Sequence, residues 1–248
     1  MLRMNLLEHC IIPDWPAPKH VQSLQTTRKG GFSASPYTSL NLGDHVGDNP
    51  LTVERNRMLL QPILPAEPVW LKQVHGTVVV DAGQASCWPQ ADACISSTPG
   101  AVCVIMTADC LPVLLCNDLG TIVGAAHAGW RGLCDGVIEQ TVHSMSVPPQ
   151  TLMAWFGPAI GPKVFEVGEE VRSAFVARQP EASTAFVPMM NGKWLADIYL
   201  LARLRLSTLG IKRVYGGDLC TYSDNKQFFS YRRENTAGRM GTFIWIEK

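Results

Sequence analysis

The fold is decided by residues 101–132, AVCVIMTADCLPVLLCNDLGTIVGAAHAGWRG. This stretch holds three apolar runs, at 101–107, 113–116 and 121–126, which predict buried strands. The sequence NDLG at 117–120 is typical of a turn, so we expect the second and third runs to form an antiparallel hairpin. A helical pattern follows directly, from Gly129 to Met145, with its apolar residues on one face.

Working outward, strands and helices alternate along the chain without a strict βαβ rhythm. The segment GDNP at 47–50 predicts a helix start, with Asp48 or Asn49 as N-cap and Pro50 in the first turn. Further helices are expected at 168–178 and 195–209, and further strands at 69–74 (continuing to 80), 91–96, 152–156, 212–215 and 243–246. No G-x-G-x-x-G follows a strand, which argues against a Rossmann fold. The prediction is a single α/β domain over residues 1–248, with a layered mixed β-sheet and flanking helices.

Composition limits the classes of function. Of the 248 residues, 46% are hydrophobic and 17% charged, which indicates a sizeable buried core. The net charge is zero, so binding to nucleic acid or to an anionic membrane that is driven by electrostatic attraction is not expected. The first residues, MLRMNLLEHCIIPDW, lack the apolar stretch of a secretory signal, and no run has the length of a membrane span. We therefore expect a soluble, cytoplasmic protein.

The eight cysteines include no C-x-x-C pair, which excludes a zinc ribbon and a thioredoxin motif. Without a secretory signal, most of them are expected to be small buried hydrophobic residues rather than disulfide partners. Cys103 and Cys116 in particular lie within apolar runs and are predicted to belong to the core.

Three short motifs each carry a side chain that can bind a metal ion. They are QVHG at 73–76 with His75, TADC at 107–110 with Cys110, and AHAGWRG at 126–132 with His127. Two imidazoles and one thiol form a three-ligand set, and catalytic zinc takes such a set together with a water molecule. The three residues are therefore predicted as both metal ligands and catalytic residues of an enzyme.

Other interpretations of these residues stay open at this point. Cys110 and His127 without a metal would form a hydrolase dyad, because a thiolate beside an imidazole is an activated nucleophile. A fourth protein ligand, from His45, Cys94 or Cys220, would instead make a closed structural metal site. The three motifs can also be independent of one another.

Candidate substrate-binding residues lie in three further segments. The glycine-punctuated loop SLNLGDHVGD at 39–48 contains Asn41, and two Gly-Pro pairs at 157–162 precede Glu166, a candidate proton carrier. The run FFSYRR at 228–233 ends in Tyr231, Arg232 and Arg233, where adjacent arginines can hold a phosphate while a ring stacks on a base. A surface turn, an exposed helix start and solvated charges are the simpler alternatives.

Seven blocks in order resemble the bacterial YfiH-like family, also called the laccase-domain or multicopper polyphenol oxidase family. The blocks are SLNLGDHVGD, QVHGT, TADCLPVL, HAGWRGL, GPAIGP, GGDLCT and FFSYRR with a following GR, and they extend from about residue 26 to 246. The resemblance implies a layered α/β fold like that of bacterial toxin cysteine hydrolases, with zinc on His75, Cys110 and His127. It also implies phosphorolysis of adenosine, inosine, guanosine and methylthioadenosine, together with adenosine deamination. Polyphenol oxidation with copper and editing of peptidoglycan precursors are alternative activities of the family.

A multicopper oxidase needs a histidine-rich trinuclear cluster, whereas this chain has six histidines and no H-x-H pair. Purine nucleoside and phosphate are therefore the expected small-molecule substrates, with copper able to replace zinc. In this scheme Arg131, Arg232 and Arg233 are candidates for phosphate, and Asp109 is expected to orient a ligand histidine. Phe228 and Tyr231 are candidates for stacking on the base, and Glu166, Asp109 or Asp218 for proton transfer.

Overall fold

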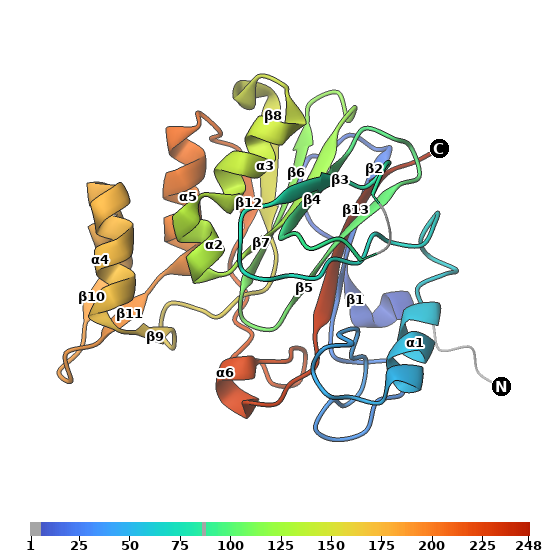
Figure 1. Cartoon of the computed structure of the whole chain (residues 1–248), viewed down its shortest axis with the longest axis horizontal. Coiled ribbons are helices and arrows are strands. Elements are labelled where there is room, and N and C mark those ends of the chain that lie inside the picture. Colours follow the sequence, from blue (N-terminus) through green and yellow to red (C-terminus); the bar gives the residue numbers. More distant parts are fainter. Residues whose placement is uncertain (1–5, 86–87) are drawn as a thin grey trace.

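The computed structural model describes residues 6–85 and 88–248. Cys87 lies outside the described residues. So do residues 1–5, which begin the stretch in which no secretory signal is expected. A six-stranded mixed sheet forms the centre of the molecule (Figure 1). Its strands, in spatial order, are β12 (Val214–Gly216), β8 (Leu152–Phe156), β6 (Leu111–Asn117), β7 (Val123–Ala128), β4 (Ala93–Ser96) and β3 (Val79–Asp81). The β6–β7 pair is the antiparallel hairpin predicted from the NDLG turn.

A second sheet of four antiparallel strands packs against the first. Its order is β1 (Cys10–Ile11), β2 (Val21–Thr26), β13 (Met240–Ile246) and β5 (Val102–Thr107). Apolar side chains from both sheets fill the space between them, among them Cys103, Leu114, Cys116, Trp155 and Ile244. The burial of Cys103 and Cys116 confirms their assignment to the core.

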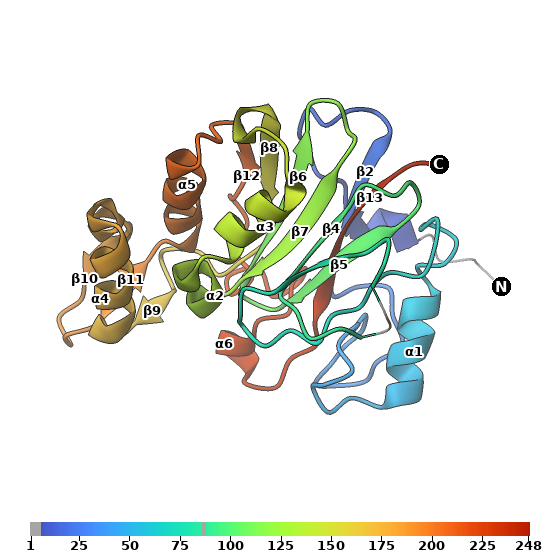
Figure 2. The ribbon, with the colours of Figure 1, turned by 45° about the horizontal axis from the view of Figure 1, so that its top comes forward.

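Helices cover the outer face of the six-stranded sheet, as Figure 2 shows. The far face of the six-stranded sheet packs on α2 (Trp130–Asp135), α3 (Val137–Met145) and α5 (Ile198–Thr208), with Phe156 and Ile138 in that core. On the opposite side, α1 (Pro50–Met58) is followed by a turn whose Leu60 and Leu64 pack with Phe243 of the four-stranded sheet. The layers therefore run helices, sheet, sheet and loops, which confirms a layered mixed α/β fold.

A small third sheet lies at the edge of the molecule beside α4 (Glu169–Arg178) (Figure 1). It consists of β10 (Phe186–Pro188), β11 (Trp194–Ala196) and β9 (Glu166–Val167), all antiparallel. The remaining elements are α6 (Tyr231–Glu234) and three 3₁₀ turns, η1 (Leu6–His9), η2 (Pro149–Thr151) and η3 (Pro180–Ala185). None of the third sheet was predicted, because its strands of two or three residues carry too few positions for a period.

Three predicted elements differ in the structure. The helix expected over 129–145 is broken at Gly136, whose φ of 103° ends α2 and starts α3. The strand expected at 69–74 makes only isolated bridges at Val69 and Lys72. The amide nitrogen of Gln73 donates to the Met106 carbonyl oxygen, and its amide oxygen accepts the Met106 N–H, both at 2.8 Å. The Gln73 side chain therefore bonds the two backbone groups that a neighbouring strand would otherwise pair.

The third difference is the helix start expected at residue 195, which falls within β11. The helix α5 starts after Asp197, whose side chain accepts the Leu200 N–H at 2.9 Å as N-cap. The predicted cap of α1 is confirmed, because Asn49 accepts the N–H groups of Leu51 and Thr52. Within the described residues, no helix combines the length and apolarity needed to cross a membrane.

Candidate metal centre and its pocket

His75, Cys110 and His127 meet at the open end of the β6–β7 hairpin. Cys110 directly precedes β6, and His127 is the residue of β7 paired with Pro112. His75 approaches from the loop before β3, with its ring centroid 4.8 Å from that of His127. One ligand atom from each of the three residues lies within 4.8 Å of the other two.

The donor set fits a single metal ion of the zinc type. Tetrahedral zinc with ordinary Zn–S and Zn–N bonds places sulfur and nitrogen about 3.6 Å apart. Cys110 Sγ and His75 Nε2 are 3.7 Å apart in the structure. His127 is buried, Cys110 half-buried and His75 exposed, so the group opens toward solvent on the side of His75.

Glycine at position 129 allows the three ligands to approach. A Cβ on Gly129 would stand 2.8 Å from His75 Cδ2 and 3.0 Å from Cys110 Sγ. Gly132 has the same function one turn later, where a Cβ would lie 2.9 Å from the carbonyl oxygen of Gly76. The GWRG segment is therefore glycine-rich because the metal-binding loop packs directly on its backbone.

Asp92 organises the group and was missed from the sequence. Its buried carboxylate accepts the N–H groups of Val74, His75 and Gly76 at 3.1, 2.9 and 2.7 Å. The same carboxylate lies 2.8 Å from His127 Nδ1. A proton on Nδ1 leaves the Nε2 lone pair for a metal. One signal was present in the sequence, since a carboxylate between Ala91 and Ala93 at the start of an apolar run must have partners when buried.

The electrostatics of the metal-free group favour a thiolate beside an imidazolium. Burial opposes charge on Cys110, but the neighbouring His127 and His75 outweigh it and lower the pKa of the thiol to about 6. Burial likewise opposes charge on His127, yet Cys110 and Asp92 raise the pKa of its imidazole to about 9. Burial raises the pKa of Asp92, but the hydrogen bonds from His127 and the backbone hold it below its usual value.

A cavity of about 230 Å³ lies beside Cys110. Its walls are mostly apolar or aromatic, with two arginines among them. The lining residues are Ala108, Asp109, Cys110, Trp130, Arg131, Ile160, Phe165, Ile198, Tyr231 and Arg232. The structure therefore brings four predicted substrate-binding residues to the metal centre: Asp109, Arg131, Tyr231 and Arg232.

Asp109 lies in the cavity wall but does not orient a histidine, contrary to the expectation. Its carboxylate accepts the hydroxyl of Thr221 at 2.6 Å, the hydroxyl of Ser230 at 3.0 Å and the N–H of Arg232 at 2.7 Å. Its carbonyl oxygen accepts the Ile160 N–H at 2.9 Å. Asp109 thus joins the cysteine ligand to three other pocket segments, while Asp92 contacts the histidine.

Asn41 and Arg233 support the backbone rather than the pocket. Asn41 is fully buried and bonds to Gly43, Asp48 and the N–H of Arg239. The guanidinium of Arg233 donates to the carbonyl oxygens of Thr221, Tyr222 and Phe228.

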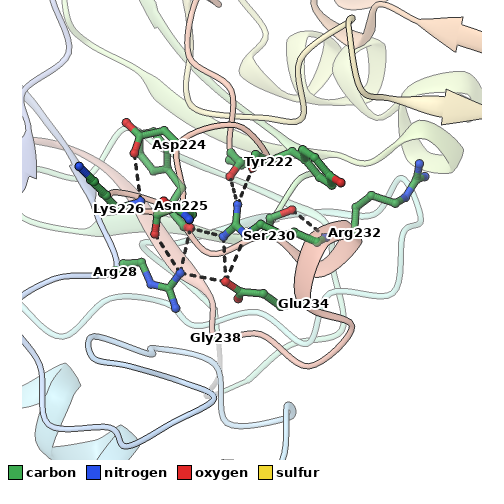
Figure 3. Close-up of polar contacts among 12 residues, drawn as sticks. Arg28, Tyr222, Asp224, Asn225, Lys226, Ser230, Arg232, Glu234 and Gly238 are labelled. Carbon is green, nitrogen blue, oxygen red and sulfur yellow. Dashed lines mark hydrogen bonds and ion pairs between the residues drawn. The ribbon is translucent and has the colours of Figure 1, made fainter.

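Arg28 and Glu234 complete the support of α6, as Figure 3 shows. Glu234 Oε1 lies 2.9 Å from both Arg28 Nη1 and Arg233 Nη2. This network holds the short helix that carries Tyr231 and Arg232 to the cavity.

Two further expectations need correction, and one stays untested. Phe228 is fully buried in a core cluster, so its ring is not available to a base. Glu166 faces a neighbouring cavity, where its side chain pairs with Lys193 and its carbonyl oxygen accepts Arg232 Nη1 at 2.8 Å. No contact of Asp218 with the site appears among the described residues, and its role in proton transfer stays a prediction.

None of the suggested fourth ligands joins the group within residues 6–85 and 88–248. Cys94 lies between the two sheets, and Cys220 Sγ accepts the Gly161 N–H at 3.2 Å. The His45 ring lies 3.4 Å from Asp44. Among the described residues the group thus offers three donors, the number that a catalytic rather than a structural zinc site takes from the protein.

Fold and site together define a layered mixed α/β protein with an open N/S metal site at the end of a β-hairpin. The model of the family described as multi-copper polyphenol oxidoreductase laccase matches residues 22–247. The chain belongs to this family, which is the YfiH-like family expected from the seven sequence blocks.

Relatives and solved structures agree over almost the whole chain. The purine nucleoside phosphorylase YfiH of Escherichia coli is 56% identical over 239 residues, covering 95% of this chain and 98% of that protein. A purine nucleoside phosphorylase of Haemophilus influenzae is 49% identical over 241 residues, covering 96% and 99%. The crystal structure of a Neisseria meningitidis protein, 51% identical, superposes with a TM-score of 0.94 and covers 97% of this chain and 100% of that one.

Proposed function

We propose that the protein is a zinc-dependent purine nucleoside phosphorylase acting on adenosine, inosine, guanosine and methylthioadenosine. One observation carries the proposal: a three-donor metal site opens beside a cavity with aromatic walls and two arginines. The names of relatives 49% and 56% identical to this chain support the same reaction class.

The reaction sets clear demands on the site. An oxygen of phosphate forms a bond to C1′ of the ribose while the bond from C1′ to the purine nitrogen breaks. The bonding electron pair leaves with the purine, which takes up a proton, and ribose 1-phosphate is the other product. The protein must therefore hold a flat heterocycle, a dianion and the ribose between them, and it must keep water out.

The side chains of the cavity match these demands. Trp130, Phe165 and Tyr231 offer ring faces on which a purine can stack, and Ile160 and Ile198 exclude water around it. Arg131 supplies a guanidinium for phosphate, because it makes no ion pair within the described part of the chain and lies over the Trp130 ring at 4.4 Å. Arg232 is the second candidate, held over Phe165 at 5.5 Å.

His75, Cys110 and His127 would hold the zinc ion, with Asp92 fixing His127 from behind. When bound, zinc supplies Lewis-acid chemistry that polarises an oxygen or activates water, which also suits the adenosine deamination we propose as a second reaction. Asp109 is not suited to proton transfer, because three hydrogen-bond donors already occupy its carboxylate.

A second candidate function rests on the lowered pKa of Cys110. A thiolate next to His127 is an activated nucleophile, so the metal-free protein has the groups of a cysteine hydrolase that could edit peptidoglycan precursors. Copper can occupy the same donors, because copper(II) binds N/S sites more tightly than zinc does. A polyphenol oxidase would need further copper ligands, and only one metal-capable group occurs in the described residues.

The test is a phosphate-dependence assay with zinc-loaded protein and adenosine, with products separated by chromatography. Phosphorolysis predicts adenine and ribose 1-phosphate in the presence of phosphate and neither in its absence. Inosine formed independently of phosphate would report deamination alone. The proposal would be overturned if the protein carried out neither phosphorolysis nor deamination of adenosine. The cysteine hydrolase would be favoured if alkylation, but not chelation, abolished hydrolysis of peptidoglycan precursors.

A further inference from the structure

We infer that Arg239 forms a phosphate subsite at the metal centre, on the side of the 39–48 loop. The inference rests on the proposed phosphorolysis and deepens it, because it adds a third guanidinium to Arg131 and Arg232 as a contact for the dianion. Arg239 does not line the cavity of Arg131 and Arg232, but its guanidinium carbon lies 5.9 Å from the ring of Tyr231, which does line it.

The guanidinium of Arg239 is largely free to bind a ligand. Nη1 donates to the carbonyl oxygens of Ala237 and Gly238 at 2.7 and 3.2 Å. Nε and Nη2 make no hydrogen bond to any described residue, and no described carboxylate lies within ion-pair distance. These two nitrogens present the parallel N–H groups with which arginine binds phosphate bidentately.

The backbone and the aliphatic part of Arg239 are both held in position by the 39–48 loop. Its N–H donates to Asn41 Oδ1 at 2.9 Å, and its carbonyl oxygen accepts the Leu42 N–H at 3.0 Å. A Cβ on Gly43 would stand 2.7 Å from Arg239 Cγ, so the loop packs directly on the aliphatic part of the side chain. A guanidinium held this way loses little conformational freedom on binding an anion.

No described carboxylate forms an ion pair with the partly buried Arg239. Burial lowers the pKa of Arg239, although the nearby Cys110 and Asp109 oppose this shift. Arginine stays protonated at neutral pH, so its desolvation favours a bound anion. Asp109 does not serve as that anion, because its carboxylate is occupied by Thr221, Ser230 and Arg232.

The other arginines near this face are engaged elsewhere. Arg57 donates to the carbonyl oxygen of Leu42 and lies over the rings of Trp70 and Trp88. Arg233 is committed to three carbonyl oxygens and Glu234. Of these three arginines, Arg239 is the one whose free edge and fixed position suit the phosphate co-substrate, in addition to Arg131 and Arg232 of the cavity.

The experiment compares Arg239→Met with the matched control Arg55→Met in zinc-loaded protein. Arg55 is an exposed arginine on α1 that stacks on Phe32 and lies outside the site. The control therefore removes the same positive charge as Arg239→Met, but at a place away from the site. The Michaelis constant for phosphate should rise about tenfold to a hundredfold in Arg239→Met and stay unchanged in the control. Arg239→Lys, which keeps the charge but not the fork, should lie between the wild type and Arg239→Met.

A second readout separates the inference from the proposed reaction. Binding of inorganic phosphate, followed by phosphorus NMR line broadening, should weaken in Arg239→Met at unchanged zinc content. If the wild type turns over with phosphate but the Michaelis constant of both Arg239 variants is unchanged, the inference alone is overturned. If the wild type shows no phosphorolysis, the proposed function fails, and the binding measurement still decides whether Arg239 holds phosphate.

Discussion

Asp92 Oδ1 lies 2.8 Å from His127 Nδ1, and both side chains are almost completely buried. The same carboxylate binds three successive backbone N–H groups in the loop that carries His75. One carboxylate therefore sets the positions of two of the three metal donors, although it is not itself a member of the donor group.

Replacement of Asp92 by Asn should weaken zinc binding about 10–100-fold. The amide has one acceptor oxygen in place of two, so it cannot serve the N–H groups of the loop and His127 together. Competition with a zinc-sensitive dye measures the affinity. Asp81→Asn is the control, because among the described residues the Asp81 carboxylate accepts a hydrogen bond only from the turn N–H of Gly83. Equal zinc affinity in wild type and Asp92→Asn would contradict the role of this carboxylate.

Removal of the metal should abolish turnover while leaving the protein folded. The donor group lies at the open end of a hairpin whose two strands are paired over six residue pairs, so the sheet does not depend on the ion. Chelation followed by circular dichroism and thermal unfolding checks this, with zinc content measured by mass spectrometry. Unfolding on chelation would indicate a closed structural site instead.

Alkylation of metal-free protein should report the lowered pKa of Cys110. Thiolate is the reactive form, so carbamidomethylation of Cys110 should rise with pH around a midpoint near 6 and fall away below it. An ordinary thiol has its midpoint at about 8.5. Peptide mass spectrometry resolves the site, and Cys10 is an internal control because burial raises its pKa to about 12. Zinc should protect Cys110, and a midpoint near the ordinary value would refute the thiolate.

Arg233→Met should lower the free energy of unfolding by about 2–3 kcal/mol, because it leaves carbonyl oxygens without their charged donor. Its Michaelis constant for phosphate should stay close to that of the wild type, since the guanidinium is committed to Thr221, Tyr222 and Phe228. Urea unfolding and phosphate titration provide the two measurements. Arg232→Met is the comparison, and it should show the smaller stability loss and the larger phosphate effect; the reverse pattern would restore Arg233 as a ligand residue.

The hairpin and the buried strands could be predicted because their apolar runs are long and end in a clear turn. His75, Cys110 and His127 could be named because each lies in a short motif with a metal-capable side chain. The break at Gly136 was hidden by a helical period that continues through it, and the role of Gln73 depends on a backbone partner 33 positions away. The role of Asp92 was hidden for the same reason, since it depends on groups brought together only by the folded sheet.

Strand β13, which ends two residues before the C-terminus, lies between β2 and β5 in the four-stranded sheet. Each of β2 and β5 has an edge whose partner in the sheet is β13, so these edges stay unpaired until residues 240–246 dock. Arg239 directly precedes this strand. Docking of β13 therefore completes both the sheet and the Arg239 side of the site, and a variant without residues 239–248 should yield an insoluble product rather than a weakened enzyme.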